Sequence, residues 1–356
     1  MGKLFGILIT LMVLGAAVAG GGWFWLNGQY TAEGPASEDG KPRLVVVEKG
    51  AGTQAIATKL KEAGVITDAD QFRLILRARE FTGEKPVMKA GEYAIPSGAS
   101  MEAVVAELTG GASMQYAVII PEGLSNFQIL EMLTGKTWNS TVGADLSYKL
   151  TGEAPADLTE GVLLPGDYAV SRGDTVADVV KRMRDAQKAL LDALWDKRAA
   201  DVAVKTRDEA IILASIVEKE TGNADEQPTV AGLYSNRLRQ GIRMQADATI
   251  VYGITKGVPL GRSITTKEIG GANDWNTYQR DGLPKTPICN PGAGAIRAAL
   301  NPGKTDAIYM MADGTGGHLF SKTYAEHQRN VDAYWKLRRA NEAAGKDTPA
   351  VRQQQR

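Results

Sequence analysis

The sequence predicts an α+β fold in which an N-terminal transmembrane helix precedes two folded regions. Three observations lead to this prediction. An uncharged apolar stretch lies near the N-terminus, a strand–turn–helix pattern occurs four times in the first half, and the second half combines helical periodicity with long polar loops. The chain has 356 residues, enough for two or three domains, and its 44% hydrophobic and 23% charged content suits ordinary packed cores.

The apolar stretch covers residues 4–26 and contains no charged residue. A helix needs about 20 apolar residues to cross a bilayer, so this stretch is long enough. Lys3 precedes it and acidic residues follow it, which predicts a cytoplasmic end at residues 1–3 and a body outside the cytoplasm. The alternative is a cleaved signal peptide, because the segment 17–19 (AVA) resembles a cleavage site. Both alternatives export the body, which a polar linker at 27–42 separates from the helix.

Composition excludes several kinds of chemistry. Lysine plus arginine equals aspartate plus glutamate at 41 each, which argues against nucleic acid as a partner because phosphate binding usually needs a basic face. The single cysteine, Cys289, allows no internal disulfide, and His318 and His327 are too few for a zinc cluster. We therefore expect no metal and no cofactor. Hydroxyl and carboxylate chemistry remains.

Four segments of the first half align without gaps: VVVEKGAGTQAIATKL, YAIPSGASMEAVVAEL, VIIPEGLSNFQILEML and YAVSRGDTVADVVKRM. Each begins with two apolar residues at a spacing of two, the strand signal, and continues to a turn glycine and a helix N-cap position. The turn glycines are Gly50, Gly98, Gly123 and Gly173. The N-cap positions are Gly52, Ser100, Ser125 and Thr175. The spacing of these glycines suggests a duplicated pair of units.

The turn and strand pattern of these segments resembles LysM-type glycan-binding modules, and the first pair of units fits best. We therefore expect a LysM-like βα subdomain at residues 43–112. The alternative is a βα scaffold that binds no ligand, because four copies of a short pattern indicate shared local structure and say little about binding.

The segment IILASIVEKETG places carboxylates in a mostly apolar helix. Thr206 and Glu209 form a capping-box pattern at its start, and Gly222 is a natural residue to follow its end. Glu218 and Glu220 are two residues apart, so they point to roughly opposite sides and cannot form one catalytic pair. A carboxylate against an apolar wall has a raised pKa, which suits a general acid. The alternative is a structural glutamate paired with a nearby arginine, and helical geometry alone does not choose between the two.

Polar loops and turns follow this helix. The segment MQADATIVYG reads as extended through Asp247, the segment 276–292 is rich in residues that can bond sugars, and a β-hairpin is expected around Gly314, Gly316 and Gly317. Polar loops around a scaffold are typical of binding sites. Our candidates to line a binding site are Asn236, Gln245, Asp247, Tyr278, Asn290 and His318. Each has a structural alternative: backbone capping for Asn236, an ion pair with Arg243 for Asp247, a core position for Tyr278, and a bond within its own hairpin for His318.

The motifs ASIVEKET, NRL, MQADATIVYG, NTY, GLPKTPICNPG and GGHLFSKTYAEH occur in this order, and together they resemble the YceG-like family of endolytic murein transglycosylases. This resemblance implies a mixed α/β catalytic region at 113–340, and the tail at 341–356 is expected to be disordered because it lacks apolar periodicity. It also implies a single-pass protein of the bacterial inner membrane whose catalytic body lies in the periplasm. Its implied partners are peptidoglycan glycan strands and peptidoglycan synthases. Ala248 and Cys289 depart from the family's usual residues, which leaves loop shape and substrate fit in doubt.

The resemblance assigns the catalytic glutamate to Glu218. A lytic reaction cuts between N-acetylmuramic acid and N-acetylglucosamine, leaves a 1,6-anhydro end and terminates strand elongation. One glutamate suffices as acid and then base, because the nucleophile is the C6 hydroxyl of the substrate. Two alternatives stay open: a LysM-like peptidoglycan-binding protein without catalysis, and a hydrolytic muramidase with Asp247 as its second carboxylate.

Overall fold

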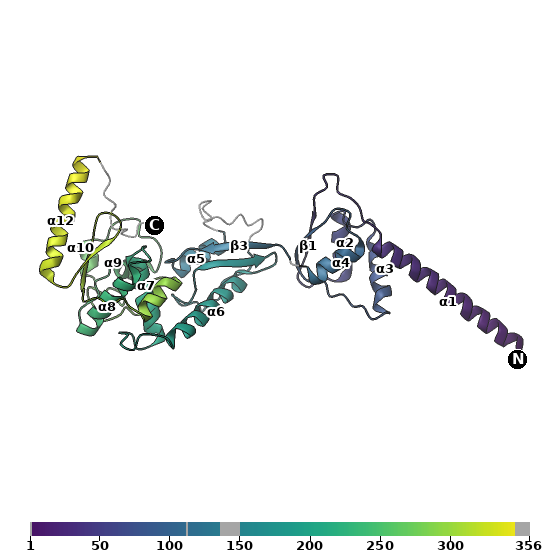
Figure 1. Cartoon of the computed structure of the whole chain (residues 1–356), viewed down its shortest axis with the longest axis horizontal. Helices are drawn as coiled ribbons and strands as arrows, with labels where there is room; N and C mark the ends of the chain where they lie inside the picture. Colours follow the sequence, from purple (N-terminus) through teal and green to yellow (C-terminus); the bar gives the residue numbers. More distant parts are fainter. Residues whose placement is uncertain (1, 112, 136–149, 346–356) are drawn as a thin grey trace. The chain divides into compact units, whose positions relative to one another are not determined.

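The computed structural model describes residues 2–111, 113–135 and 150–345 (Figure 1). The chain divides into two compact units, residues 1–116 with 169–174 and residues 117–168 with 175–356. The predicted mixture of helices and strands behind an N-terminal apolar helix is confirmed. The expected disorder at 341–356 concerns mainly residues outside the described part of the chain, and the last described helix extends to Ala343.

Helix α1 (Gly2–Thr31) is longer than the predicted span. Among the described residues it is the one helix long and apolar enough to cross a membrane, over Phe5–Thr31. It continues into the expected linker because Tyr30, near its end, is buried in the core of the first unit. Folding of the unit therefore holds the last turn of α1 in helical form.

The first unit is built on an antiparallel pair of strands, β1 (Arg43–Val47) and β2 (Gly91–Ile95), with Val45 opposite Tyr93. Three helices complete it: α2 (Thr53–Glu62), α3 (Ala69–Glu80) and α4 (Met101–Gly110). Val45 and Val47 of β1 and Tyr93 and Ile95 of β2 are buried with the apolar faces of these helices in one core. The LysM-like character of this unit stays a prediction.

The repeat predicted from the sequence is confirmed as four strand–turn–helix units. All four turn glycines have positive φ, from 74° to 98°, a backbone that favours glycine. Ser100, Ser125 and Thr175 cap their helices through the side chain, whereas Gly52 occupies the cap position without a side-chain bond. The third and fourth strand–turn–helix segments contain β3 (Gln115–Ile120) with α5 (Asn126–Leu133), and β4 (Gly166–Ser171) with α6 (Val176–Trp195). Strands pair β1 with β2 and β3 with β4, as a duplicated pair requires.

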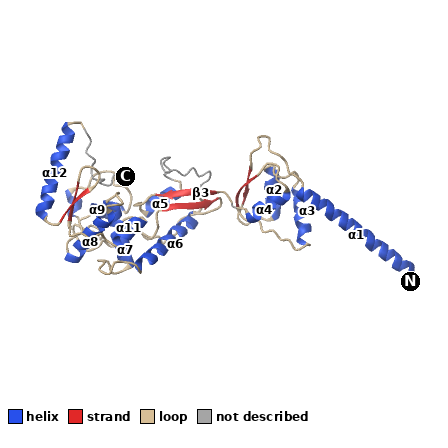
Figure 2. Ribbon diagram, viewed as in Figure 1, coloured by secondary structure: helices blue, strands red, loops and turns tan. Residues whose placement is uncertain are grey.

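The second unit has its core around α7 (Arg207–Glu220), which packs against α8 (Gln227–Gln240) and α11 (Ala293–Leu300) (Figure 2). Every residue of α7 from Ala210 to Val217 is buried, because neighbours cover the helix on all sides. The remaining elements are α9 (Asp247–Thr255), α10 (Thr266–Gly270), the hairpin β5 (Tyr309–Ala312) and β6 (His318–Ser321), and α12 (Tyr324–Ala343). The predicted hairpin is confirmed.

One local prediction, around α7, was confirmed in part, and one around α9 was wrong. Helix α7 begins after the expected N-cap Thr206 and ends at Glu220 with Thr221 as its C-cap, so Gly222 follows the cap as expected but does not adopt a left-handed backbone. Instead Thr221 is extended, and its hydroxyl accepts from the Asn223 backbone N–H at 3.0 Å, which turns the chain. Asp247 does not lie in an extended segment but is the first residue of α9, a favourable place for a carboxylate because helix N-termini are positive.

Candidate active site

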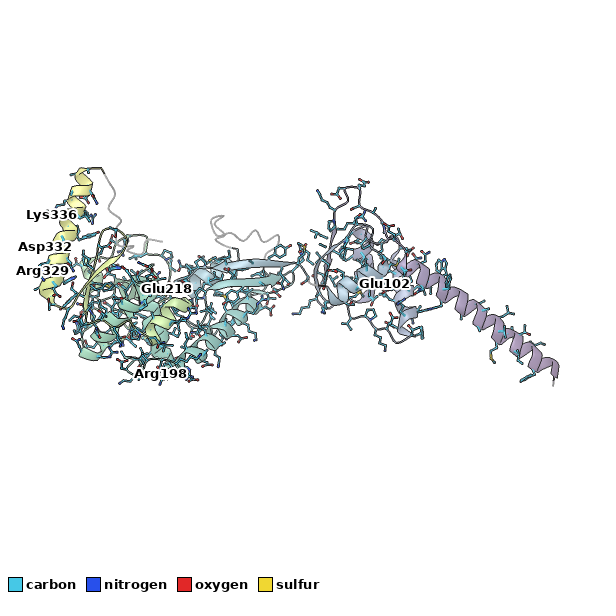
Figure 3. All side chains as sticks on the ribbon, viewed as in Figure 1. Glu102, Arg198, Glu218, Arg329, Asp332 and Lys336 are labelled. Carbon is cyan, nitrogen blue, oxygen red and sulfur yellow. The ribbon has the colours of Figure 1, made fainter. Side chains whose placement is uncertain are left out.

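The two glutamates at the end of α7 have different surroundings. The Glu218 carboxylate accepts from the backbone N–H of Gly292 at 3.0 Å, and Gly292 is the N-cap of α11. Glu218 is half-buried in the interior of the second unit (Figure 3). Its pKa is raised to about 7, mainly by burial and also by the nearby charge of Glu122, while the hydrogen bond from Gly292 acts to lower it. Glu218 thus links the end of α7 to the start of α11.

Glu220 lines a cavity of ≈ 460 Å³. It is half-buried, and the Tyr234 hydroxyl donates a hydrogen bond to its carboxylate. Burial raises the pKa of Glu220 to about 7, Asp247 also raises it, and Tyr234 and Arg237 act in the opposite direction. A carboxyl group with this pKa is part protonated at neutral pH, as a general acid requires.

The cavity wall comes from eight parts of the second unit: the end of α7, helices α8, α9 and α12, strand β5, and the segments around 245, 263 and 278. Its polar and aromatic members include Glu220, Tyr234, Arg237, Gln245, Asp247, Arg262, Ser263, Tyr278, His327, Tyr334, Trp335 and Arg338. On α12 the exposed side chains of Arg329, Asp332 and Lys336 follow one another along the helix (Figure 3). Its Tyr334, Trp335 and Arg338 belong to the cavity instead.

Asp247 and Tyr278 form a hydrogen-bonded pair in the cavity wall. The Tyr278 hydroxyl donates to Asp247 Oδ1 at 2.7 Å. Burial and the Asp247 charge raise the pKa of Tyr278, so its hydroxyl keeps its proton at neutral pH. Asp247 does not take the ion pair considered as its alternative, because Arg243 binds Asp281 at 2.9 Å. The site therefore holds a second carboxylate near Glu220.

Gln245 is held in an unusual backbone conformation. Its φ is +54°, in the left-handed region, where a non-glycine residue costs about 1–3 kcal/mol. Arg237 supports it: its Nη1 donates to Met244 O at 2.7 Å and to Gln245 Oε1 at 3.3 Å. The Arg237 Nε donates to Ile308 O at 2.6 Å, next to β5. One guanidinium thus holds the turn that brings the Gln245 amide into the cavity wall.

The structure brings three of the seven predicted site residues to the cavity: Gln245, Asp247 and Tyr278. The other four, Glu218, Asn236, Asn290 and His318, are not among its lining residues. Asn236 donates to the carbonyls of Thr305 and Ala307 at 2.9 and 3.1 Å.

Asn290 and His318 also have structural contacts. Asn290 is fully buried, and it donates to Leu124 O at 3.1 Å and accepts from the Leu163 N–H at 2.9 Å. His318 Nδ1 lies 2.9 Å from a carboxylate oxygen of Glu226. These contacts join segments that are distant in the sequence and place none of these side chains in the cavity wall.

Sequence reasoning missed Glu220, Tyr234, Arg237 and Trp335 as members of the site. A signal existed for two of them, since Tyr234 and Arg237 are three residues apart and so share a face of one helix. The contribution of α12 had no signal. Within the described ranges, no group of three or more His, Cys, Asp or Glu side chains could hold a metal ion.

Comparison with known proteins identifies the family of this chain. The model of the YceG-like family matches residues 45–333. The chain belongs to the YceG-like family. The expected family membership is thereby confirmed, and the match includes both pairs of repeated segments and all of the cavity lining except Tyr334, Trp335 and Arg338.

Relatives of this YceG-like protein carry a functional name. It is 27% identical over 323 residues to a Bacillus subtilis protein named endolytic murein transglycosylase, covering 84% of this chain and 87% of that one. A Streptococcus pneumoniae protein of the same name is 25% identical, and the alignment covers 91% of this chain but only 64% of the relative. A solved YceG-like protein of Listeria monocytogenes is 24% identical, with a TM-score of 0.46, covering 80% of this chain and 98% of that one.

Proposed function

We propose that this protein is an endolytic murein transglycosylase that cuts peptidoglycan glycan strands and leaves 1,6-anhydro-N-acetylmuramic ends. The observation that carries the proposal is the Glu220 carboxyl group, which has a pKa of about 7 and lines a polar cavity in a member of the YceG-like family. The name of the Bacillus subtilis relative supports the same reaction. Such a cut in a growing strand would terminate its elongation.

The proposed reaction needs one acid–base group. Protonated Glu220 donates its proton to the glycosidic oxygen of the leaving N-acetylglucosamine as the bond from that oxygen to C1 of N-acetylmuramic acid breaks. The C6 hydroxyl of the same muramic ring then bonds to C1 and gives its proton to the Glu220 carboxylate. The proton is returned, no water is consumed, and general acid–base catalysis of this kind contributes about 10²- to 10⁴-fold in rate.

Glu220 is the better candidate for this role than Glu218, the residue expected from the resemblance. Both carboxyl groups have a pKa of about 7, so the pKa does not distinguish them. Position favours Glu220, because Glu220 lines the larger cavity, whereas Glu218 accepts from the backbone of Gly292 and lies beside Gly123. We propose Glu220 as the catalytic acid, and the assignment of this role to Glu218, expected from the resemblance, stays a prediction that the glutamine variants of both residues test.

Three other residues have proposed roles around the reacting sugar. The Asp247 carboxylate would stabilise the positive charge that develops at C1, and Tyr278 holds this carboxylate through its 2.7 Å hydrogen bond. Gln245 would orient the sugar through its side-chain amide. Of the residues expected to bind substrate, three are kept in our proposal: Gln245, Asp247 and Tyr278.

A hydrolytic muramidase is the second candidate function. It is favoured by one observation, that Asp247 and Glu220 line the same cavity, since a hydrolase needs two carboxyl groups around the scissile bond. In that reaction water would attack C1, and the product would be a reducing end.

Product chemistry tests both candidates. Full-length protein in detergent is incubated with purified, un-crosslinked glycan strands, and the new ends are identified by mass spectrometry. We expect anhydro ends with the wild type and none with Glu220→Gln, which also controls for contaminating enzymes. Reducing ends would establish a muramidase, and no cutting by the wild type would favour a binding protein without catalysis.

We also propose that α1 anchors the protein in the bacterial inner membrane with its body in the periplasm. Its uncharged span and the preceding Lys3 support this orientation. Protease added outside spheroplasts should digest the body and leave a short anchored fragment. A fully protected body would reverse the topology, and a body that is released intact would favour a cleaved signal peptide.

The remaining proposals concern binding partners. A LysM-like subdomain at 43–112 would hold glycan strands, and peptidoglycan synthases would supply the nascent strands that the catalytic region at 113–340 cuts. Pull-down of the Glu220→Gln protein with insoluble peptidoglycan tests the first, and co-purification from membranes with a glycan polymerase tests the second. A negative result in either experiment would contradict that binding partner but not the proposed reaction.

A further inference from the structure

The most exposed large apolar side chain in the described part of the molecule is Phe81, which is 88% exposed. Val87, six residues on, is 79% exposed. Both lie in the segment 81–90, which connects α3 to β2 in the first unit. Contiguous exposed apolar surface marks interaction sites, whereas single exposed apolar residues are ordinary, so this pair has meaning only through its position and its charged surroundings. Neither side chain contributes to the cavity or to the core of its own unit.

Contacts with α1 fix the direction in which α3 runs. Near the start of α3, Gln71 donates to the side chain of Gln29 at 3.1 Å. Near its end, Arg79 donates to Asn27 at 3.1 Å, and its guanidinium lies 6.0 Å from the ring of Trp23. Helix α3 therefore contacts the end of α1 and diverges from it at an angle, with its C-terminal end on the side of the apolar part of α1 (Figure 2). The segment 81–90 follows directly at that end.

The C-terminal end of α3 lies near the end of the apolar stretch of α1. The uncharged stretch ends at Leu26, and Trp23 and Trp25 occupy the last turn before it. Tryptophan side chains are enriched where lipid headgroups meet the acyl chains. Phe81, two residues beyond Arg79, is thus level with the headgroup region of any bilayer that α1 spans.

The charge around the two apolar side chains fits an anionic lipid surface. Arg77, Lys85 and Lys89 are exposed on either side of Phe81 and Val87. Arg79 and Glu84 neutralise one another at 2.8 Å, which leaves Glu80 as the one other acidic residue between 77 and 89. Basic side chains beside apolar anchors are the usual composition of interfacial membrane contacts.

We propose that residues 81–90 form a second membrane contact, in which Phe81 and Val87 enter the headgroup region of the outer leaflet and the flanking cations bind anionic phospholipid. The proposal rests on α1 spanning the bilayer and is independent of the catalytic reaction. Its consequence is that the first unit is held against the membrane at two points, the end of α1 and this segment, so that it cannot swing freely about the anchor.

Depth-dependent fluorescence quenching tests this contact. Full-length protein is reconstituted into phosphatidylcholine vesicles containing about one third phosphatidylglycerol, an anionic surface. A fluorophore is attached through Thr82→Cys or, as the matched control, Lys49→Cys in the exposed turn after β1. The native Cys289 is fully buried and will not react in the folded protein.

We expect lipids with a quencher near the headgroup to quench the label at position 82 severalfold more than the label at position 49. Equal quenching at both positions would overturn the proposal. Replacing Phe81 and Val87 by serine in the Thr82→Cys protein should remove most of this quenching, and unchanged quenching would refute their role as anchors. Alkaline carbonate extraction checks α1 separately, because a protein that leaves the vesicles would remove the premise itself. None of these readouts depends on glycan cleavage.

Discussion

Glu218 and Glu220 occupy the same turn of α7, have a raised pKa of about 7 for the same main reason, burial, and yet belong to different parts of the molecule. Glu218 accepts from the N-terminus of α11, whereas Glu220 accepts from Tyr234 in the wall of the cavity. Burial explains the pKa of both carboxyl groups, but only Glu220 is among the residues that line the larger cavity. A perturbed pKa therefore identifies candidates, and geometry chooses among them.

Exchange of each glutamate for glutamine gives the largest expected difference. Glu220→Gln should lower kcat by about 10²- to 10⁴-fold, because glutamine cannot donate and recover the proton. Glu218→Gln keeps an oxygen that accepts from Gly292, so kcat should change by less than about tenfold, a barrier change below about 1.4 kcal/mol. Anhydro-end formation in detergent measures both.

The opposite result, an inactive Glu218→Gln with an active Glu220→Gln, would restore the assignment made from the resemblance. Circular dichroism and thermal unfolding of each variant provide the control, since loss of activity counts only in a folded protein.

The pH dependence of the free energy of unfolding tests whether Glu218 is buried in a form that takes up a proton. The ordinary pKa of Glu218 is 4.5, and its pKa in the folded protein is about 7. The folded state binds this proton more tightly, so the stabilisation is complete below pH 4.5 and is lost as the pH rises through about 7. Glutamine never ionises, so the free energy of unfolding of Glu218→Gln relative to wild type should rise between these pH values.

The expected rise is on the order of 2 kcal/mol, since one pKa unit corresponds to about 1.4 kcal/mol and solvent reduces the effect at a half-buried group. Chemical denaturation of both proteins at several pH values measures it. Below pH 4.5 both side chains are neutral, so the difference there is the internal control. A difference that does not change with pH would contradict the burial of an ionisable Glu218.

The local structure could be predicted from the sequence more completely than the candidate site. The turn glycines and caps of the four repeated units depend on residues within one short segment, which is why Gly98 with Ser100 and Gly173 with Thr175 were predictable. The hairpin and the N-cap Thr206 are predictable for the same reason. The cavity depends on long-range packing. Nothing local in WKLR indicates that Trp335 joins Glu220 at one wall.

The dependence of the cavity on long-range packing also explains why the sequence could not choose between Glu218 and Glu220. Period 3.6 puts Glu218 and Glu220 on different faces, but which face meets a cavity depends on where α8 and α11 pack. Asn290 was predicted to bind substrate because it is a polar residue in a loop rich in turn residues. Its amide instead forms hydrogen bonds with the backbone of Leu124 and Leu163 in the interior.

The pH–rate profile tests the neighbours of Glu220. Because the reactive form is protonated, kcat should fall as the pH rises through about 7. Asp247 raises the pKa of Glu220, so Asp247→Asn should move this fall to lower pH. The Tyr234 hydrogen bond lowers that pKa, so Tyr234→Phe should move the fall to higher pH. Shifts of opposite sign, each below about one pH unit, are expected whatever happens to the absolute rate.

Profiles that stay in place in both variants would mean that Glu220 is not the titrating acid. The Glu218→Gln profile is the matched control, and it should coincide with that of the wild type if Glu218 takes no part in the reaction.

The smallest expected effect concerns the strained turn at Gln245. At φ +54°, glycine relieves the strain and alanine keeps it, so Gln245→Gly should be more stable than Gln245→Ala by about 1 kcal/mol. Both variants lose the side-chain amide, so both should show the same loss of substrate binding. Thermal unfolding and KM measure the two effects separately. Equal stability would show that the turn relaxes without its side chain. Recovery of KM in the glycine variant alone would show that backbone shape, rather than the Gln245 amide, positions the sugar.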